Sequence, residues 1–503
     1  MHSFRLTYVL LLVACCSHPA HAQVLTWKKG QRDIRESSPK EIKEPRPWEV
    51  PVKLVLTPAA EPSPPLKYRC WIPMDQRQPG DVESSVSRAV IMYLQNPLRG
   101  KLDSQYAEIA KALPGTYSGD AIPNEELRNQ VRDYLDSQAD VLKQLYYALR
   151  LHTIESNYVV RHRVGLDLTN ANAANAQNLR ALARLLQLEC GLAIAEGRFE
   201  DAVYALQSGY RLAELSLRCD TETVLTQLVS LSISGIMNYE VQSLLQLPDA
   251  PNMYWALASV PQQELYSPRA AVEGELFSIT GTLMPWTVED IDVASEAQSE
   301  SRLLELISNV QRVMHSPSRE FVPTPTQDRL IAALVVALLA DQARIEIGGA
   351  ESGSCQALVE WTTTGFQAAM EKVLKWSYLP LDLRLARADL IDASLAGYRG
   401  IPESPAGILV GLVLPAVQAL DSAVARNLRQ HSLLITLEAL RAYAAENSGA
   451  LPETLDNLTP LTAWPDTSTG KPFEYQRTDL HHAVIHIEKS LGVPSEYQIE
   501  IRQ

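Results

Sequence analysis

Apolar residues at helical spacing dominate the chain from residue 82 onward. Asn124 followed by two glutamates is typical of a helix start. The residues after it that share one face are Leu127, Val131, Leu135, Leu142, Tyr146 and Leu149. This spacing predicts one long amphipathic helix, and apolar stretches at 219–247 and 327–347 predict others. Helices separated by proline-marked breaks favour a mainly α fold, either an irregular α-solenoid or packed helical bundles.

The spacing of apolar residues changes from helical to strand-like near the C-terminus. Asn447-Ser448-Gly449 is typical of a helix end, and apolar–polar alternation begins at 471–475. Alternation returns at 482–488 and 497–501, as strands require. The sequence therefore predicts a small C-terminal α+β module, in which a helix leads into a small antiparallel sheet.

Five segments are predicted from these changes of pattern. They are a signal peptide at 1–22, a proline-rich linker at 23–80, a helical domain at 81–260, a second helical region at 261–405 and the α+β module at 406–503. Prolines are dense between Pro39 and Pro65, which favours extended backbone. We expect the linker to be a spacer that contributes nothing to a hydrophobic core.

The first 22 residues are typical of a secretory signal peptide. Arg5 precedes an apolar run, and Ala20-His21-Ala22 fits cleavage before Gln23. Residues 12–15, LVAC, also resemble the lipobox of bacterial lipoproteins, which implies a lipidated Cys15 at the mature N-terminus. Both alternatives predict export to the periplasm or the cell exterior, with membrane attachment only through that lipid.

No other segment is predicted to span a membrane. The apolar runs at 330–340 and 406–420 are shorter than the roughly 20 residues that a bilayer needs, and the second contains Pro415. The net charge of −14 would repel a phosphate backbone, so nucleic acid is not an expected partner.

The cysteines permit disulfides without requiring them. Cleavage after Ala22 leaves Cys70, Cys190, Cys219 and Cys355, an even number in an oxidising compartment. Sequence alone does not select among the possible pairings. Cys190 lies on an apolar helical face, which favours a buried thiol that packs as a small hydrophobic residue.

Residues 188–214 resemble a tetratricopeptide unit. Gly197 stands at the turn, Phe199 follows it, Ala202 occupies the small packing position, and Leu206 and Gly209 continue that face. The resemblance implies a single helical hairpin, because Ala193 and Glu214 replace the usual tyrosine and proline and no further copy is evident.

Residues 407–476 resemble the pseudopilins of type II secretion systems. An apolar helix ends at Asn447-Ser448-Gly449 before Leu451-Pro452, and Gly470-Lys471-Pro472-Phe473 matches the turn before the pseudopilin sheet. No processing site precedes Gly407, and Pro415 with Asp421 is expected to shorten the helix. The whole pattern also resembles a group of exported bacterial helical proteins that carries no assigned activity.

Two groups of polar residues are candidate sites. His482, His486 and Glu488 share one face of a predicted strand. Such a face could bind a metal ion, and the alternative interpretation is a polar face exposed to solvent. His152 and Glu155 would share a helical face upstream of His162, which suits acid–base chemistry or a surface ion pair. The common hydrolase, metalloprotease and nucleotide-binding motifs are absent from the sequence, and no cofactor is predicted.

Three functions remain as expectations. The first is an exported helical scaffold or binding protein of the bacterial cell envelope with a protein or peptide partner. The second is an extracytoplasmic hydrolase whose acid and base lie on different helices and therefore leave no linear motif. The third is a pilin-like structural component, which the resemblance of the C-terminal segment implies.

Overall fold

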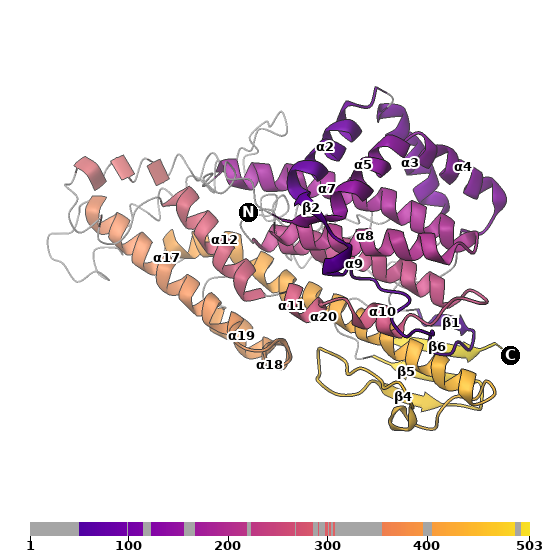
Figure 1. The fold of residues 1–503 in the computed structure, drawn as a ribbon. Coiled ribbons are helices and arrows are strands. Elements are labelled where there is room, and N and C mark those ends of the chain that lie inside the picture. The colour runs from indigo at the N-terminus through magenta and orange to yellow at the C-terminus, as the bar shows by residue number, and fades with distance from the viewer. Residues whose placement is uncertain are drawn as a thin grey trace, which may run out of the picture.

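The computed structural model of the protein is mainly helical, with a small sheet formed near the C-terminus (Figure 1). It describes residues 50–97, 99–113, 122–154, 166–218, 223–266, 268–284, 290, 297–299, 301–302, 305–306, 355–395, 405–487 and 494–502. The expected fold class, a mainly α protein with a small C-terminal α+β module, is confirmed.

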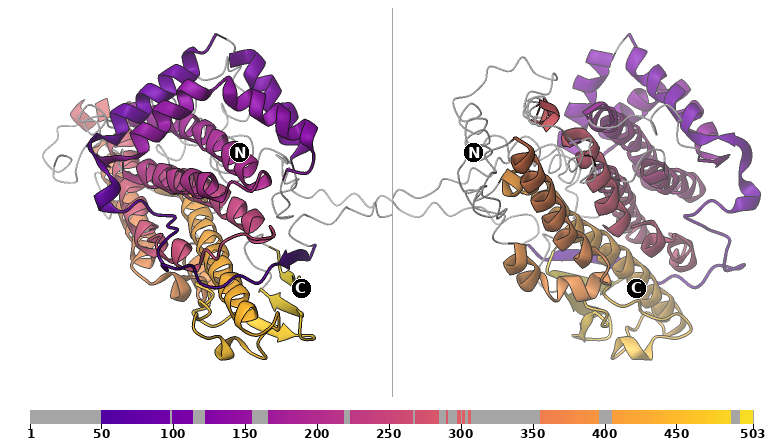
Figure 2. Two further views of the ribbon diagram at one scale, coloured as in Figure 1. Left: turned by 45° about the vertical axis from the view of Figure 1, so that its right-hand side comes forward. Right: turned by 90° about the vertical axis from the view of Figure 1, so that its left-hand side faces the viewer.

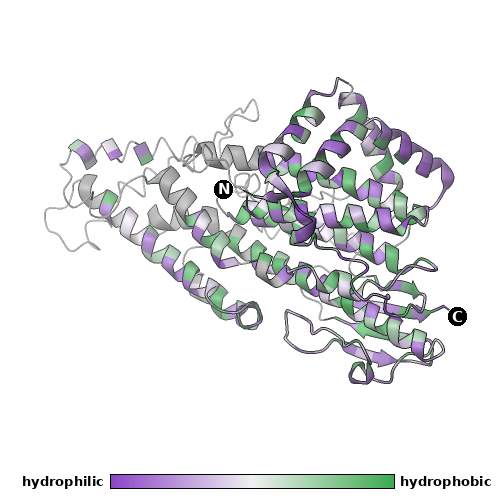
Figure 3. Ribbon diagram, in the orientation of Figure 1, coloured by the Kyte–Doolittle hydropathy of each residue, from purple (hydrophilic) through white to green (hydrophobic). Residues whose placement is uncertain are grey.

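Helices from the first half of the chain form a packed body (Figure 1). They are α2 (Val82–Gln95), α3 (Arg99–Ala112), α4 (Glu125–Asp136), α5 (Ala139–Leu149), α7 (Leu166–Ala195), α8 (Phe199–Arg218) and α9 (Val224–Leu245), followed by the short α10 (Tyr254–Ala258) and α11 (Gln262–Leu265). Hydrophilic residues predominate on α4 (Figure 3), while α7, α8 and α9 pack against one another in the interior.

The remaining helices form an arm that projects from this body (Figures 1 and 2). They are α12 (Pro268–Leu283), α17 (Cys355–Ser377), α18 (Leu381–Leu385), α19 (Ala388–Leu395) and the N-terminal half of α20 (Pro405–Glu446). The expectation that Pro415 and Asp421 shorten the apolar helix is wrong, because α20 runs through both positions. Within the described ranges, no helix is both long and apolar enough to cross a membrane.

The long helix expected after Asn124 is two helices. Asn124 is the N-cap, and its Oδ1 accepts a hydrogen bond from the amide of Leu127 at 2.8 Å. The first helix ends at Asp136, where the Ser137 hydroxyl donates to the Tyr134 carbonyl at 2.5 Å. A serine hydroxyl that bonds local backbone competes with the helical ladder, so the apolar stripe continues in α5 after a break.

The α7–α8 hairpin has the turn that the sequence predicts. Gly197 adopts a φ of +71°, and the Arg198 amide bonds the Ala193 carbonyl at 2.8 Å, as in a glycine-terminated helix. Phe199 begins α8. Further along α8, a Cβ at Gly209 would lie 2.0 Å from Sδ of Met237 on α9, so the glycine permits the close approach of the two helices.

The sheet has the strand order β1-β6-β5-β4. Its strands are β1 (Val52–Leu56), β4 (Glu474–Arg477), β5 (His482–His486) and β6 (Glu496–Ile501), with the 3-10 turn η4 (Leu455–Asn457) preceding β4. β4, β5 and β6 are antiparallel neighbours, whereas β1 pairs with β6 in parallel. The sheet lies beside the C-terminal half of α20 (Figure 1).

The expectation that the proline-rich segment contributes nothing to a core is wrong for its C-terminal part. Val52, Leu54 and Leu56 of β1 are buried, and they belong to the same continuous core as α7, α8, α9, α20 and the C-terminal strands. The stretch VKLVL alternates as a strand should, and the prolines lie on either side of it.

The chain after β1 crosses the helical body as a strap, defined here as residues 57–81 (Figure 1). The amide of Ala59 donates to the Arg441 carbonyl, and the amide of Cys70 donates to the Ala256 carbonyl, both at 3.1 Å. The strap contains η2 (Met74–Gln76) and β2 (Gln78–Asp81), which pairs with β3 (Leu151–Thr153). It therefore connects the sheet, α20, α10 and the N-terminal helices.

Candidate functional site

A row of buried polar side chains follows α9 at a spacing of four residues: Ser230, Ser234, Asn238 and Gln242. This spacing places them on one helical face. Asn427 and His431 of α20 face part of this row, with Ser234 Oγ 3.4 Å from Asn427 Oδ1 and His431 Nδ1 3.3 Å from Asn238 Oδ1. We call Ser230, Ser234, Asn238, Asn427 and His431 the polar seam.

His431 occupies the centre of the polar seam and is 1% exposed. Both ring nitrogens face oxygens that accept hydrogen bonds: Nε2 lies 3.1 Å from the Leu257 carbonyl, and Nδ1 faces Asn238 Oδ1. The neutral ring has one N–H and can donate to only one of the two oxygens. The Tyr210 hydroxyl donates to the same Asn238 oxygen at 2.7 Å. Burial lowers the pKa of His431 to about 4, so the ring is neutral at physiological pH.

We expect His431 to make the protein less stable in acid. Its pKa is about 4 in the folded chain and about 6.5 in the unfolded chain. The unfolded state therefore binds a proton first as the pH falls. The stability that the neutral ring provides is complete above pH 6.5 and decreases towards pH 4. Between pH 7 and pH 4.5 the loss amounts to about 2.5 kcal/mol.

Urea unfolding of the wild type and of His431→Gln at both pH values measures this loss. Glutamine keeps a side-chain donor but does not titrate, so the variant should lose less stability on acidification than the wild type. Burial raises the pKa of Glu240 to about 7 and of Asp421 to about 6, which acts in the opposite direction, but both groups are present in both proteins. Equal pH dependence would contradict the prediction.

Glu240 is the described carboxyl group best suited to proton exchange near neutral pH. Burial raises its pKa to about 7, although the hydrogen bond from Gln187 Nε2 to Glu240 Oε1, 3.1 Å long, opposes the shift. Oε2 lies against the α7 backbone, 3.2 Å from where a Cβ of Gly191 would stand. The carboxylate of Glu240 thus accepts from one side-chain amide and lies against a helix backbone.

The Glu438–Arg441 pair connects distant parts of the chain. Both side chains are fully buried, and Arg441 Nη1 lies 2.9 Å from Glu438 Oε2. Arg441 donates to the Thr57 carbonyl at 2.9 Å and to the Ala250 carbonyl at 2.7 Å. Glu438 Oε1 accepts from the Met253 amide at 2.7 Å. Burial raises the pKa of Glu438, and Arg441 opposes that shift.

Two further arginines pair with carboxylates at α20. Arg429 Nε donates to Asp466 Oδ1 at 3.1 Å, and Arg429 also contacts the Ser468 hydroxyl, which attaches the loop before β4 to the helix. Arg384 of α18 lies 3.0 Å from Asp421, which attaches α18 to α20 within the arm. Buried charges require such partners, because an unpaired charge in the interior is costly.

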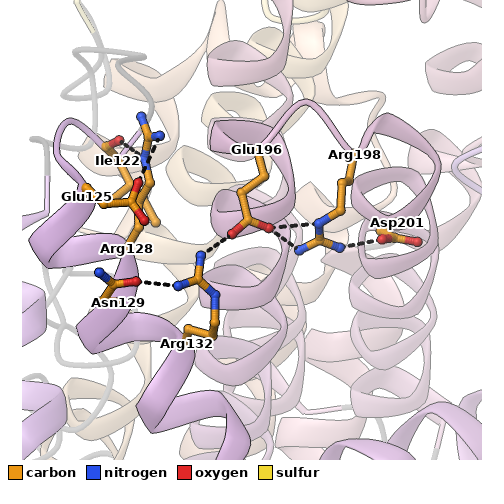
Figure 4. A network of polar contacts seen from close by, with 8 residues as sticks. All are labelled: Ile122, Glu125, Arg128, Asn129, Arg132, Glu196, Arg198 and Asp201. Atoms are coloured by element: carbon orange, nitrogen blue, oxygen red, sulfur yellow. Dashed lines mark hydrogen bonds and ion pairs between the residues drawn. The ribbon is translucent and has the colours of Figure 1, made fainter.

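A network on the surface joins α4 to the α7–α8 turn (Figure 4). Glu196 lies between Arg132, at 2.6 Å, and Arg198, at 2.7 Å, and Arg198 also contacts Asp201. Hydrogen bonds from the arginines lower the pKa of Glu196 against the effect of burial. The side chains are partly exposed, so the network positions α4 but contributes little energy per pair.

Two of the three candidate metal residues, His482 and His486, lie in the part of the chain that the structure describes. His482 and His486 lie on β5, where Ala483 and Ile485 alternate with them and are buried. His482 Nδ1 bonds Asp479 at 2.9 Å, and Glu488 lies outside the described residues. Among the described residues, no three His, Cys, Asp or Glu side chains are grouped as a metal site requires.

His152 does not lie on a helix, contrary to the expectation from its spacing to Glu155. His152 lies on β3 and is exposed, and its carbonyl accepts from buried Arg211 at 3.1 Å. The strand forms because β2 of the strap pairs with it, a partner that local spacing does not reveal. Glu155 and His162 lie outside the described residues, as does Cys15.

Cys70 and Cys190 are buried free thiols. Burial raises the pKa of both, so they remain protonated and pack as small hydrophobic groups. The side chains of Cys219 and Cys355 lie outside the described residues, so pairing between those two stays open.

The polar seam and the Glu438–Arg441 pair were not among the candidates from the sequence, although signals for them exist. The four-residue spacing of polar positions in α9 is visible in the sequence, as are a glutamate and an arginine three residues apart in the apolar stretch of 433–444.

Comparison of the chain with family models, curated proteins and solved structures gives no match.

Proposed function

We propose that the protein is an exported helical scaffold or binding protein of the bacterial cell envelope. The observation that carries the proposal is the way α20 uses its buried charges. Glu438–Arg441 connects the strap and the α9–α10 loop to this helix, Arg429–Asp466 connects the sheet loop, and Arg384–Asp421 connects α18. Ionisable groups in these ion pairs hold other segments of the chain against one long helix. They are therefore not free to transfer protons.

The expected partner is a protein or peptide of the envelope. The arm presents helical surfaces, the usual means by which helical scaffolds bind peptides. The signal pattern of residues 1–22 supports export, and a lipid on Cys15 would be the means of attachment to a membrane.

Fractionation of cells that express the full chain tests the proposal. We expect the protein in the periplasmic or membrane fraction, with a mature N-terminus at Gln23, or at a lipidated Cys15, by mass spectrometry. Affinity purification from that fraction should recover a stoichiometric protein partner. Ala22→Asp removes the small residue required for cleavage before Gln23, and Cys15→Ser removes the lipidation site, so the two variants separate the two processing routes.

An intact Met1 in the cytoplasmic fraction would contradict the proposal. A second candidate, an exported hydrolase, is favoured by Glu240, whose pKa of about 7 suits acid–base chemistry. Glu240→Gln separates the two functions, because a scaffold retains its partner in this variant while a hydrolase that depends on Glu240 loses turnover.

A further inference from the structure

The first and last described strands of the chain are neighbours in the sheet. Val52 of β1 is in register with Tyr497 of β6, and Leu56 with Ile501. Nearly the whole chain lies between the two strands. Pairing between distant segments has a high entropic cost of loop closure and is slow compared with the packing of adjacent helices.

The place that β1 occupies is formed by three other elements. β6 provides the hydrogen-bonding edge, and Gln246 at the end of α9 accepts from the Val55 amide at 3.2 Å on the opposite edge of β1. At the end of the strand, the Arg502 amide donates to the Leu56 carbonyl at 2.8 Å and Arg441 of α20 donates to Thr57. We call this place the strand-acceptor site.

The strand-acceptor site also selects side chains. Alternate residues of β1, Val52, Leu54 and Leu56, enter the core, whereas Lys53 points to solvent and pairs with Glu500 at 2.7 Å. An extended segment with this alternation therefore fits in one register, because a shift by one residue would bury Lys53.

We propose that the strand-acceptor site binds the β1 segment in a separate, late step of folding, after the C-terminal residues have been synthesised. α7, α8 and α9 are consecutive in the chain and can pack earlier. β6 follows β1 by more than 400 residues, so β1 has no partner strand until residues 496–501 have been synthesised. The delay leaves the chain incompletely closed until then, as export of an unfolded chain requires. That consequence rests on the proposed function.

Pulsed hydrogen exchange during refolding of the chain from Gln23 tests the order of events. We expect the amides of α7, α8 and α9 to become protected first, and those of 52–56 and 496–501 to follow at least about tenfold more slowly. Simultaneous protection of the strands and the helices would overturn the proposal.

A labelled peptide of residues 50–60 tests the site itself. Added in excess during refolding, the peptide should be captured, whereas the same peptide carrying Leu54→Asp should not, because it would bury a carboxylate. Equal capture of the two peptides, or capture of neither, would overturn the proposal. Both experiments use purified protein, so their outcome does not depend on where the protein resides in the cell.

Discussion

Replacement of Arg441 by methionine is expected to lower the free energy of unfolding by about 3–5 kcal/mol. The change leaves the Glu438 carboxylate without its charged partner in the interior, where neither side chain is exposed. It also removes the hydrogen bonds that the guanidinium donates to the carbonyls of Thr57 and Ala250. Buried carbonyls without donors add to the loss.

Urea unfolding of Arg441→Met against a matched exposed pair measures this effect. Arg269 and Glu273 form an ion pair of 2.8 Å with both side chains exposed, so Arg269→Met should cost at most about 1 kcal/mol. Adding Glu438→Gln to Arg441→Met removes the unpaired charge and should recover part of the loss. A loss in Arg441→Met no greater than in Arg269→Met would contradict the prediction.

Arg441 is important because it joins segments that are far apart in the sequence. The strap, the α9–α10 loop and α20 come from the beginning, middle and end of the sequence, and the guanidinium bonds backbone atoms of the first two. Arginine suits this position because its donors point in fixed, divergent directions. Lysine has a charge but cannot reach two separate segments with the same geometry.

Local features of the fold were readable from the sequence. The Asn124 cap, the glycine turn at Gly197 and the alternation of 482–486 are each determined by residues within one turn or one strand. Steric limits and backbone hydrogen bonding act over such short distances, so composition and spacing suffice to predict them.

Long-range features were not readable. β1 lies in a stretch of prolines, and its partner strand is at the other end of the chain. Local spacing does not show that His152 lies on a strand, because its strand partner, β2, is likewise distant in sequence. In the candidate site, His431 gave no local signal, because the burial that lowers its pKa comes from α9 and the α10 segment and not from its own helix.

The sheet with its N-terminal strand also bears on the pseudopilin resemblance. Gly449, with a φ of +82°, follows the end of α20, and Gly470, with a φ of +67°, lies in the turn before β4. β6, however, is covered on one edge by β1 from the start of the chain. A pilin-like role therefore remains a proposal for the C-terminal segment. The resemblance does not predict the N-terminal strand β1 that completes the sheet.

Leu54→Asp is expected to lower the free energy of unfolding by more than about 4 kcal/mol. Leu54 is fully buried in the middle of β1 and belongs to the hydrophobic core, so the change would place a carboxylate among apolar side chains. Leu54→Ala, which creates a cavity without a charge, should cost about 2–5 kcal/mol.

Lys53→Asp is the matched control, because it places the same side chain one residue away on the solvent face. It removes the exposed ion pair with Glu500, which lies 36% exposed, and should cost at most about 1 kcal/mol. Urea unfolding of the three variants, followed by circular dichroism, gives the comparison. If Leu54→Asp and Lys53→Asp had equal effects, β1 would not be part of the core. The sheet would then be three antiparallel strands that fold without the N-terminal segment.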